Sequence, residues 1–240
     1  MANKRLIVSG CSSTDYCWPT WAHYLGKMYD RYENWAQAGS DNATIVRRFK
    51  FDEVTADDTV VIMWSGWNRH VKWNPKGAPT YKDPDNYWEY CYDIWDKNWL
   101  VHQYSPIERL AASMDNIRTL DIHSKLVGYD LYHFSLFPWK KGELEENDLE
   151  QFNMVYDQYD IQNNFLLDSD LITFRVDNNG KMRYSTEYNP DDPHTGPLIN
   201  YRYASEVMMP SIKNIPNPQD LMADALRDED NLNKGIIDRF

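Results

Sequence analysis

The sequence predicts an α/β fold, in which buried parallel strands alternate along the chain with helices. Two short apolar runs indicate the strands: one begins at Arg5 and stops at Gly10, and the other covers Thr59 to Trp64. Continuous runs of this length are typical of strands buried on both faces, as they are in a parallel sheet. Between them, residues 18–31 carry large apolar side chains at intervals of four and three, the spacing of one helix face. A strand followed by a helix is the repeating unit of such a fold.

Length and composition bound the classes of function. The 240 residues suffice for one α/β domain with a full core, and the formal net charge of −12 opposes binding to nucleic-acid phosphates. No apolar stretch has the length of a membrane span, and the N-terminus lacks the apolar core of a secretion signal. We therefore expect a protein kept in a cytoplasm unless it leaves as part of a larger particle. The three cysteines are expected to be reduced, and neither a metal nor a cofactor is expected.

Glycine and polar residues follow the next two strands as well. Residues 32–36 are predicted to form a second short strand, which runs into a turn of small residues that contains Gly39. A Ser or Asp of this turn can cap a helix from Ala43 to about Phe51. The strand that ends at Trp64 is followed by Ser-Gly-Trp-Asn-Arg at 65–69. Three strand ends thus resemble one another in residue type.

The aromatic stretch at about 72–105 allows two interpretations. Trp88, Tyr92, Trp95 and Trp99 repeat at four, three and four residues, which predicts a helix. Such a helix most often packs its rings against the domain. The alternative is an aromatic platform for sugar rings, in which case this stretch would border a binding site.

The rest of the chain supplies further expected elements and a tail. The elements are a core helix from Pro106 to about Leu120, a strand that begins at Leu126 and can extend to Phe134, an acidic helix at 143–157, a hairpin of 171–176 and 181–184, and a helix at 198–209. We expect one domain at 1–210, with the aromatic insertion at about 72–105. An acidic C-terminal tail at 211–240 follows, which either contacts a partner or is mobile.

Ser12 is the candidate nucleophile, because it follows Gly10 at the carboxyl end of the first strand. A serine hydroxyl needs a base to take its proton, and His194 is the only histidine in the C-terminal third of the chain. Asp191, one tight turn away, can accept a hydrogen bond from the imidazole. The alternative is purely structural: residues 12–14 cap a helix after a glycine turn, and Asp191 with Asp192 caps the last helix.

Other chemistries fit the same residues less well. Asp191, Asp192 and His194 could bind a metal ion, but no second cluster completes the site. Cys11 could be the nucleophile, but a small buried thiol is the commoner fate of such a residue. Nucleotide binding is disfavoured, because no glycine-rich phosphate loop follows the first strand.

Four features mark three strand ends and one helix entry: Gly10-Cys11-Ser12, Gly39, Gly66-x-Asn68 and Asp191-x-x-His194. In this order they resemble the SGNH (GDSL-like) hydrolases, over roughly residues 5–209. The resemblance implies a three-layer α/β/α sandwich (SGNH/flavodoxin-like) with a mostly parallel sheet of about five strands. It also implies that Ser12 is the nucleophile, His194 the base and Asp191 the residue that orients the imidazole. The backbone N–H groups of Ser12 and Gly39 and the side-chain amide of Asn68 would form the oxyanion hole.

The sequence is similar, more closely, to small SGNH-like proteins common in bacteriophage genomes. These carry Gly-Cys-Ser and Trp-Ser-Gly, which stand here at residues 10–12 and 64–66. Three positions depart from the wider family: Cys11 replaces an acid, Arg69 replaces the Asp after the asparagine, and Thr195 replaces the Pro after the histidine. None removes a catalytic group, so they bear on the hydrogen bonds of the site and on the substrate class.

The resemblance implies a metal-independent serine hydrolase that acts on ester bonds. An O-acetyl or related acyl group on a carbohydrate is the expected substrate, and Trp67, Arg69 and His70 are the expected substrate-binding residues. Neither nucleic acid nor a membrane is expected as a partner, while the tail could contact a virion or a second copy of the chain. The alternative is a binding or structural protein of a phage particle that keeps the fold with weak or lost activity.

Overall fold

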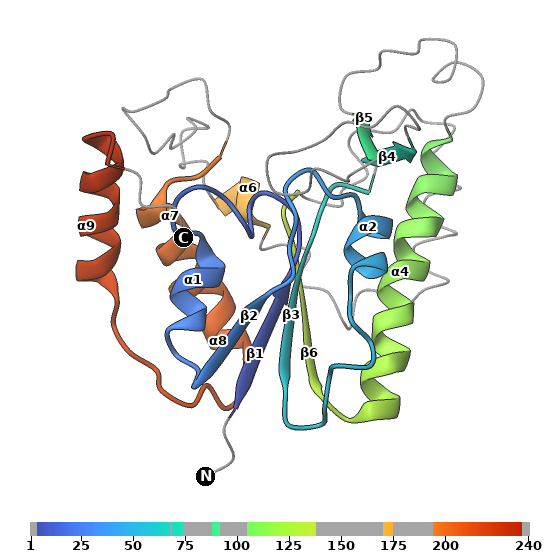
Figure 1. Ribbon diagram of the computed structural model, residues 1–240, viewed down its shortest axis with the longest axis horizontal. Coiled ribbons are helices and arrows are strands. Elements are labelled where there is room, and N and C mark those ends of the chain that lie inside the picture. Colours follow the sequence, from blue (N-terminus) through green and yellow to red (C-terminus); the bar gives the residue numbers. More distant parts are fainter. Residues whose placement is uncertain are drawn as a thin grey trace.

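The computed structural model describes residues 4–67, 69–73, 88–91, 105–137, 170–174 and 194–236. In this part of the chain, four parallel strands form a central sheet between two layers of helices (Figure 1). The strands lie in the order β2-β1-β3-β6. They are β1 (Arg5–Ser9), β2 (Arg31–Asn34), β3 (Thr59–Trp64) and β6 (Asp130–Ser135). The predicted α/β/α fold with a parallel sheet is confirmed, and the described part of that sheet has four strands.

The helices cover both faces of the sheet (Figure 1). On one side lie α1 (Trp21–Gly26), α7 (Pro197–Tyr203), the π-helical segment η3 (Ala204–Met208), α8 (Met209–Ser211) and α9 (Met222–Asn233). On the other side lie α2 (Asn42–Arg47) and α4 (Pro106–Val127). Successive residues of a strand therefore enter different cores: Leu6 and Val8 pack with Trp21, whereas Ile7 packs with Leu110. Burial on both faces explains why the strand runs are apolar without interruption.

The order of the strands reverses at β1. The chain passes from β1 to β2 on one side and then returns to β3 on the other side of β1. In open α/β sheets, ligands bind outside the carboxyl ends of the strands where the order reverses in this way. Ser12 lies just after β1, so the topology places it at the carboxyl end of the strand where the order reverses.

Helix α4 is longer than the sequence predicts, and the predicted start of the fourth strand at Leu126 is therefore wrong. The Ser105 side chain accepts a hydrogen bond from the backbone N–H of Glu108, which caps the helix start. The helix continues past Leu120 until Gly128, whose φ of 95° is left-handed and ends it. Residues 126 and 127 are thus helical, and the strand begins at Asp130. Helices α1 and α2, at six residues each, are shorter than expected.

Two further expectations are wrong where the structure describes them. Residues 88–91 form the strand β5 (Trp88–Cys91), which pairs antiparallel with β4 (His70–Trp73), rather than the start of a helix. Aromatic residues suit strands, so pairing with β4 overrides the helical spacing; residues 92–99 lie outside the described residues. Residues 171–174 form the short helix α6 (Leu171–Phe174) instead of a hairpin strand. The Asp170 side chain caps this helix by accepting a hydrogen bond from the backbone N–H of Thr173. The expected partner strand and the acidic helix at 143–157 also lie outside.

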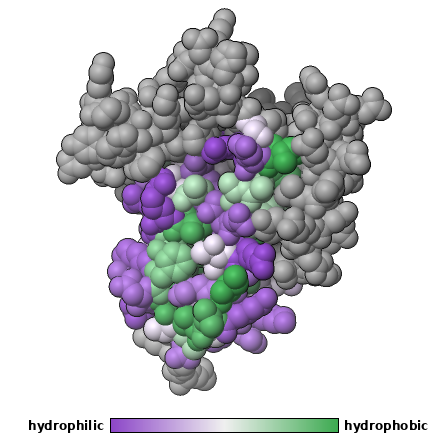
Figure 2. Space-filling model, turned by 90° about the vertical axis from the view of Figure 1, so that its right-hand side faces the viewer, coloured by the Kyte–Doolittle hydropathy of each residue, from purple (hydrophilic) through white to green (hydrophobic). Residues whose placement is uncertain are grey.

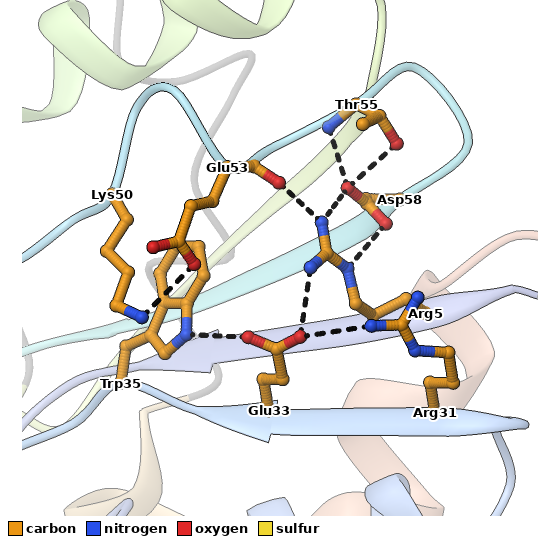
Figure 3. A network of polar contacts seen from close by, with 8 residues as sticks. All are labelled: Arg5, Arg31, Glu33, Trp35, Lys50, Glu53, Thr55 and Asp58. Carbon is orange, nitrogen blue, oxygen red and sulfur yellow. Dashed lines mark hydrogen bonds and ion pairs between the residues drawn. The ribbon is translucent and has the colours of Figure 1, made fainter.

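A network of ion pairs surrounds Arg5, the first residue of β1, and so lies at the end of that strand away from Ser12 (Figure 3). The Arg5 guanidinium donates to both carboxylate oxygens of Asp58, at 2.9 and 2.6 Å, and to Glu33 at 2.9 Å. Burial alone would raise the pKa of Asp58, but hydrogen bonds from Arg5 and Thr55 outweigh it and hold that pKa below its usual range. The hydrogen bond to Asp58 raises the pKa of Arg5 further. This network links β1, β2 and the turn before β3.

The C-terminal segment packs against the helices on one face of the sheet. Helix α9 contacts α1 through a hydrogen bond of 3.0 Å from the Tyr24 hydroxyl to Asp228, and it contacts Lys27, the residue after α1, through the Lys27–Asp224 ion pair at 2.9 Å. The backbone N–H of Leu198, in the first turn of α7, donates to Glu229 at 3.1 Å. The division of the chain at residue 210 stays a prediction.

The outer face on the side of α4 mixes hydrophilic and hydrophobic side chains (Figure 2). The exposed large apolar residues of α4 are Ile122 and Leu126. Within the described ranges, none of the helices combines the length and the apolar character that a membrane span requires.

Candidate active site

Ser12 and His194 meet at the carboxyl edge of the sheet, by which we mean the side where the parallel strands have their carboxyl ends. In the sequence, 182 positions separate the two residues. Ser12 Oγ lies 2.7 Å from His194 Nε2. Ser12 follows β1, and His194 lies just before α7, so the packing of α7 beside the sheet brings the two together. If Nε2 accepts the hydrogen bond from the hydroxyl, the proton of the neutral imidazole is on Nδ1. That is the tautomer in which the ring can take the serine proton.

Gly10 makes room for the turn that carries Ser12. A Cβ atom on Gly10 would lie 2.2 Å from the Thr14 hydroxyl oxygen and 3.0 Å from the backbone carbonyl of Met63 in β3. The backbone N–H of Thr14 donates to the carbonyl of Cys11 at 2.9 Å, which closes the turn around Ser12. The φ of Gly10 is not left-handed, so glycine is required here by close approach rather than by an unusual backbone angle. Cys11 itself is fully buried.

The backbone that follows His194 is held by two buried side chains. The Trp18 indole N–H donates to the Thr195 carbonyl at 2.9 Å. The Asn200 amide donates to the same carbonyl at 2.6 Å and to the next one along the chain at 3.0 Å. The side-chain oxygen of Asn200 accepts from the backbone N–H of Trp21 at 3.2 Å. Because Asn200 is in α7 and Trp21 begins α1, this amide ties the segment of the base to the segment of the nucleophile.

Tyr16 covers one face of the imidazole. Its ring is stacked on that of His194, with ring centroids 3.8 Å apart and an angle of 20° between the planes. The Trp18 ring meets Tyr16 edge-on, with centroids 4.5 Å apart. The chain between β1 and α1 therefore supplies the serine, the stacked ring and one of the two groups that hold the Thr195 carbonyl.

Gly39 lies in a turn that is attached to the end of β1. The backbone N–H of Gln37 donates to the carbonyl of Gly10 at 3.2 Å, and that of Ser40 donates to the carbonyl of Gln37, also at 3.2 Å. Gly39 has a φ of 82°, the left-handed value that the third position of a type II turn requires. The turn conformation alone accounts for the glycine, so its role as an oxyanion donor stays a prediction.

Arg69 connects the two loops that follow β2 and β3. Its guanidinium donates to the Ser40 carbonyl at 3.0 Å and to the Ser65 hydroxyl at 2.7 Å. Asn42 makes a second connection, since its side-chain oxygen accepts from the backbone N–H of Ser65 at 2.9 Å and its amide donates to the hydroxyl of Ser113 at 3.1 Å. These contacts hold Ser65 and Arg69, which stand on either side of the predicted oxyanion donor Asn68 in the sequence.

The other predicted site residues are only partly described. Asp191 and Asn68 lie outside the described residues, so their predicted roles are untested. Trp67 is 5% exposed and packs in the core on the side of α2 and α4. His70 begins β4, where the structure describes the backbone alone. Within the described ranges, no group of three His, Cys, Asp or Glu side chains could hold a metal ion.

Sequence reasoning missed four residues that shape the site: Tyr16, Trp18, Asn42 and Asn200. Trp18 and Asn200 each make a hydrogen bond to a residue more than 170 positions away in the sequence, so no local pattern marks that contact. Tyr16 stands four positions after Ser12, but nothing in the sequence indicates that its ring faces His194.

Comparisons with known proteins give likenesses of fold. No family model matches the chain, and no curated protein matches it. Solved structures similar to it include TesA, at 18% identity and a TM-score of 0.49, with 88% of this chain and 99% of that chain covered. A GDSL-like lipase from Bacteroides thetaiotaomicron is 15% identical, with a TM-score of 0.45 and coverage of 88% and 89%. A phospholipase A1 from Streptomyces albidoflavus is 10% identical, with a TM-score of 0.38 and coverage of 89% and 100%. At such identities the activity has to be judged from this chain's own side chains.

Proposed function

We propose that the protein is a serine hydrolase of the SGNH type, which cleaves ester bonds with Ser12 as nucleophile and His194 as base. The observation that carries the proposal is the 2.7 Å contact between Ser12 Oγ and His194 Nε2 at the carboxyl edge of the sheet. A serine and a histidine in hydrogen-bond contact are the minimum that nucleophilic acyl transfer requires.

In the first half of the reaction, Ser12 Oγ bonds to the carbonyl carbon of the ester while its proton passes to Nε2 of His194. The carbonyl oxygen then carries a negative charge. When the tetrahedral species collapses, the bond to the leaving oxygen breaks, and that oxygen takes the proton from Nε2. The products of this half are a free alcohol and an acyl group bonded to Ser12.

In the second half, water replaces the alcohol. His194 takes a proton from the water as its oxygen bonds to the acyl carbon, and Ser12 leaves with that proton as the acid is released. The backbone N–H groups of Ser12 and Gly39 and the Asn68 amide are the proposed oxyanion donors, and Asp191 is the proposed partner of Nδ1. Loss of one such donor costs on the order of a hundredfold to a thousandfold in rate.

For the substrate, we propose an O-acetyl or similar acyl group on a carbohydrate. Support comes from composition: Trp, Tyr and Phe make up 15% of the chain, and they are concentrated at about 72–105. Aromatic faces suit the apolar faces of sugar rings. For the origin of the protein, we propose a phage genome, because the sequence resembles SGNH-like proteins that phages encode.

A fluorophosphonate probe tests the nucleophile, because it reacts covalently with activated serines. We expect the wild type to be labelled and Ser12→Ala to be unlabelled. Ser13→Ala is the matched control, since it removes the neighbouring hydroxyl and should leave labelling intact. Labelling that survives in Ser12→Ala would overturn the proposal.

Hydrolysis of p-nitrophenyl acetate tests the base. His194→Ala should abolish measurable turnover, and Asp191→Ala should lower it strongly, while circular dichroism shows that both variants are folded. If the folded wild type neither reacts with the probe nor hydrolyses the ester, the alternative of a binding or structural protein with this fold takes its place.

A further inference from the structure

We propose that Tyr16 is a positioning residue for the base: its ring fixes the orientation of the His194 imidazole and stabilises the ring in its positively charged form. The inference rests on the proposed function, because it concerns the step in which His194 takes a proton from Ser12. It adds a residue to which the sequence assigns no role.

The geometry is that of a close, nearly parallel stack. Centroids 3.8 Å apart with planes 20° from parallel place the two rings in direct face contact. An imidazole ring held this way cannot turn about its bond to Cβ without losing the contact. Rotation is the motion that would move Nε2 away from Ser12 Oγ, which lies 2.7 Å from it. The stack therefore keeps the base aimed at the nucleophile.

The charge change during the reaction uses the same contact. The face of an aromatic ring carries negative electrostatic potential, so it attracts a cation that lies over it. His194 is neutral before the proton transfer and positive after it. The Tyr16 ring thus interacts more favourably with the state that follows the transfer than with the state before it, which is the condition for raising kcat.

Tyr16 is itself held in place. The Trp18 ring packs edge-on against it at 4.5 Å, and the Trp18 indole N–H donates to the carbonyl of Thr195, the residue after the base. The stacked ring and the backbone of the base are therefore braced by one side chain. The orientation of Tyr16 and that of His194 are set together.

Two substitutions separate the ring from the hydroxyl of Tyr16. Tyr16→Phe keeps the aromatic face, and Tyr16→Leu keeps an apolar side chain without it. We expect Tyr16→Phe to retain the kcat of the wild type on p-nitrophenyl acetate. Tyr16→Leu removes the attraction between the aromatic face and the positively charged imidazole. From the usual strength of that attraction, we expect kcat to fall by about twofold to fivefold, with little change in KM. The rate of fluorophosphonate labelling should fall in parallel, since it depends on activation of Ser12.

Phe49→Leu is the control for loss of a buried ring, because Phe49 packs on the opposite side of the sheet. It should lower the thermal midpoint and leave kcat unchanged at a temperature where the protein is folded. The inference is overturned if Tyr16→Leu keeps the wild-type kcat, if Tyr16→Phe loses as much as Tyr16→Leu, or if the main effect is on KM, which would indicate a contact to the substrate. A wild type that is not labelled at Ser12 would instead overturn the proposed function.

Discussion

Replacing Asn200 by alanine should weaken both the fold and the catalytic site. The Asn200 side chain is 1% exposed and takes part in three hydrogen bonds, two donated to the carbonyls of residues 195 and 196 and one accepted from the backbone N–H of Trp21. Alanine removes all three. The Thr195 carbonyl keeps its bond from Trp18, but the Trp21 N–H loses its acceptor.

The magnitude follows from those contacts. A buried donor left without an acceptor costs about 1–3 kcal/mol, and each further hydrogen bond contributes a net 0.5–1.5 kcal/mol, roughly. The free energy of unfolding should therefore fall by about 3 kcal/mol, which lowers the thermal midpoint of a chain of this size by roughly 6–12 °C. The segment that bears His194 also loses its tie to α1. A displacement of the base by about 1 Å can cost on the order of a hundredfold in rate.

The assay combines chemical denaturation with ester hydrolysis at a temperature where every variant is folded. Asp58→Asn is the matched control, because it breaks the buried pair with Arg5 at the opposite edge of the sheet. Both variants should lose stability, but kcat should fall in Asn200→Ala alone. If Asn200→Ala loses stability and keeps the kcat of the wild type, the position of His194 does not depend on this amide, and the reasoning is refuted.

Three more perturbations test the structure. Gly10→Ala should lower the yield of folded protein, because its Cβ would lie 2.2 Å from the Thr14 hydroxyl oxygen, and adding Thr14→Ala should restore part of it; unchanged folding of the single variant would contradict the close approach. Since the pKa of Asp58 is lower in the folded chain than its ordinary value of about 4, the stability that it contributes is present above that value and lost as the pH falls through the folded pKa. Denaturation at several pH values should show this loss, with a flatter dependence in Asp58→Asn. Deleting residues 211–240 should lower the thermal midpoint, because Ala225 and Leu232 of α9 are buried against the domain; an unchanged midpoint would show that α9 contributes nothing to stability.

Sequence alone determined the elements whose signals are local. The strands β1 and β3 are read from continuous apolar runs, because burial on both faces favours apolar side chains along the middle of each strand. The start of α4 is read from Pro106, a residue that the first turn of a helix tolerates. Ser12 and His194 were singled out for the chemistry of their side chains and for their positions at a strand end and before a helix.

Tertiary structure decided the features that depend on partners far along the chain. Residues 88–91 and 171–174 have sequences compatible with either helix or strand, and pairing with β4 and capping by Asp170 select the outcome. The contact between Ser12 and His194 and the stacking of Tyr16 on the imidazole require α7 to pack beside the sheet. Hydrophobic patterning identifies the face of an element that is buried but not the element that covers it, because the hydrophobic effect has no direction. The order of the strands and the directed bonds of Trp18 and Asn200 supply that information, and they exist only in the folded chain.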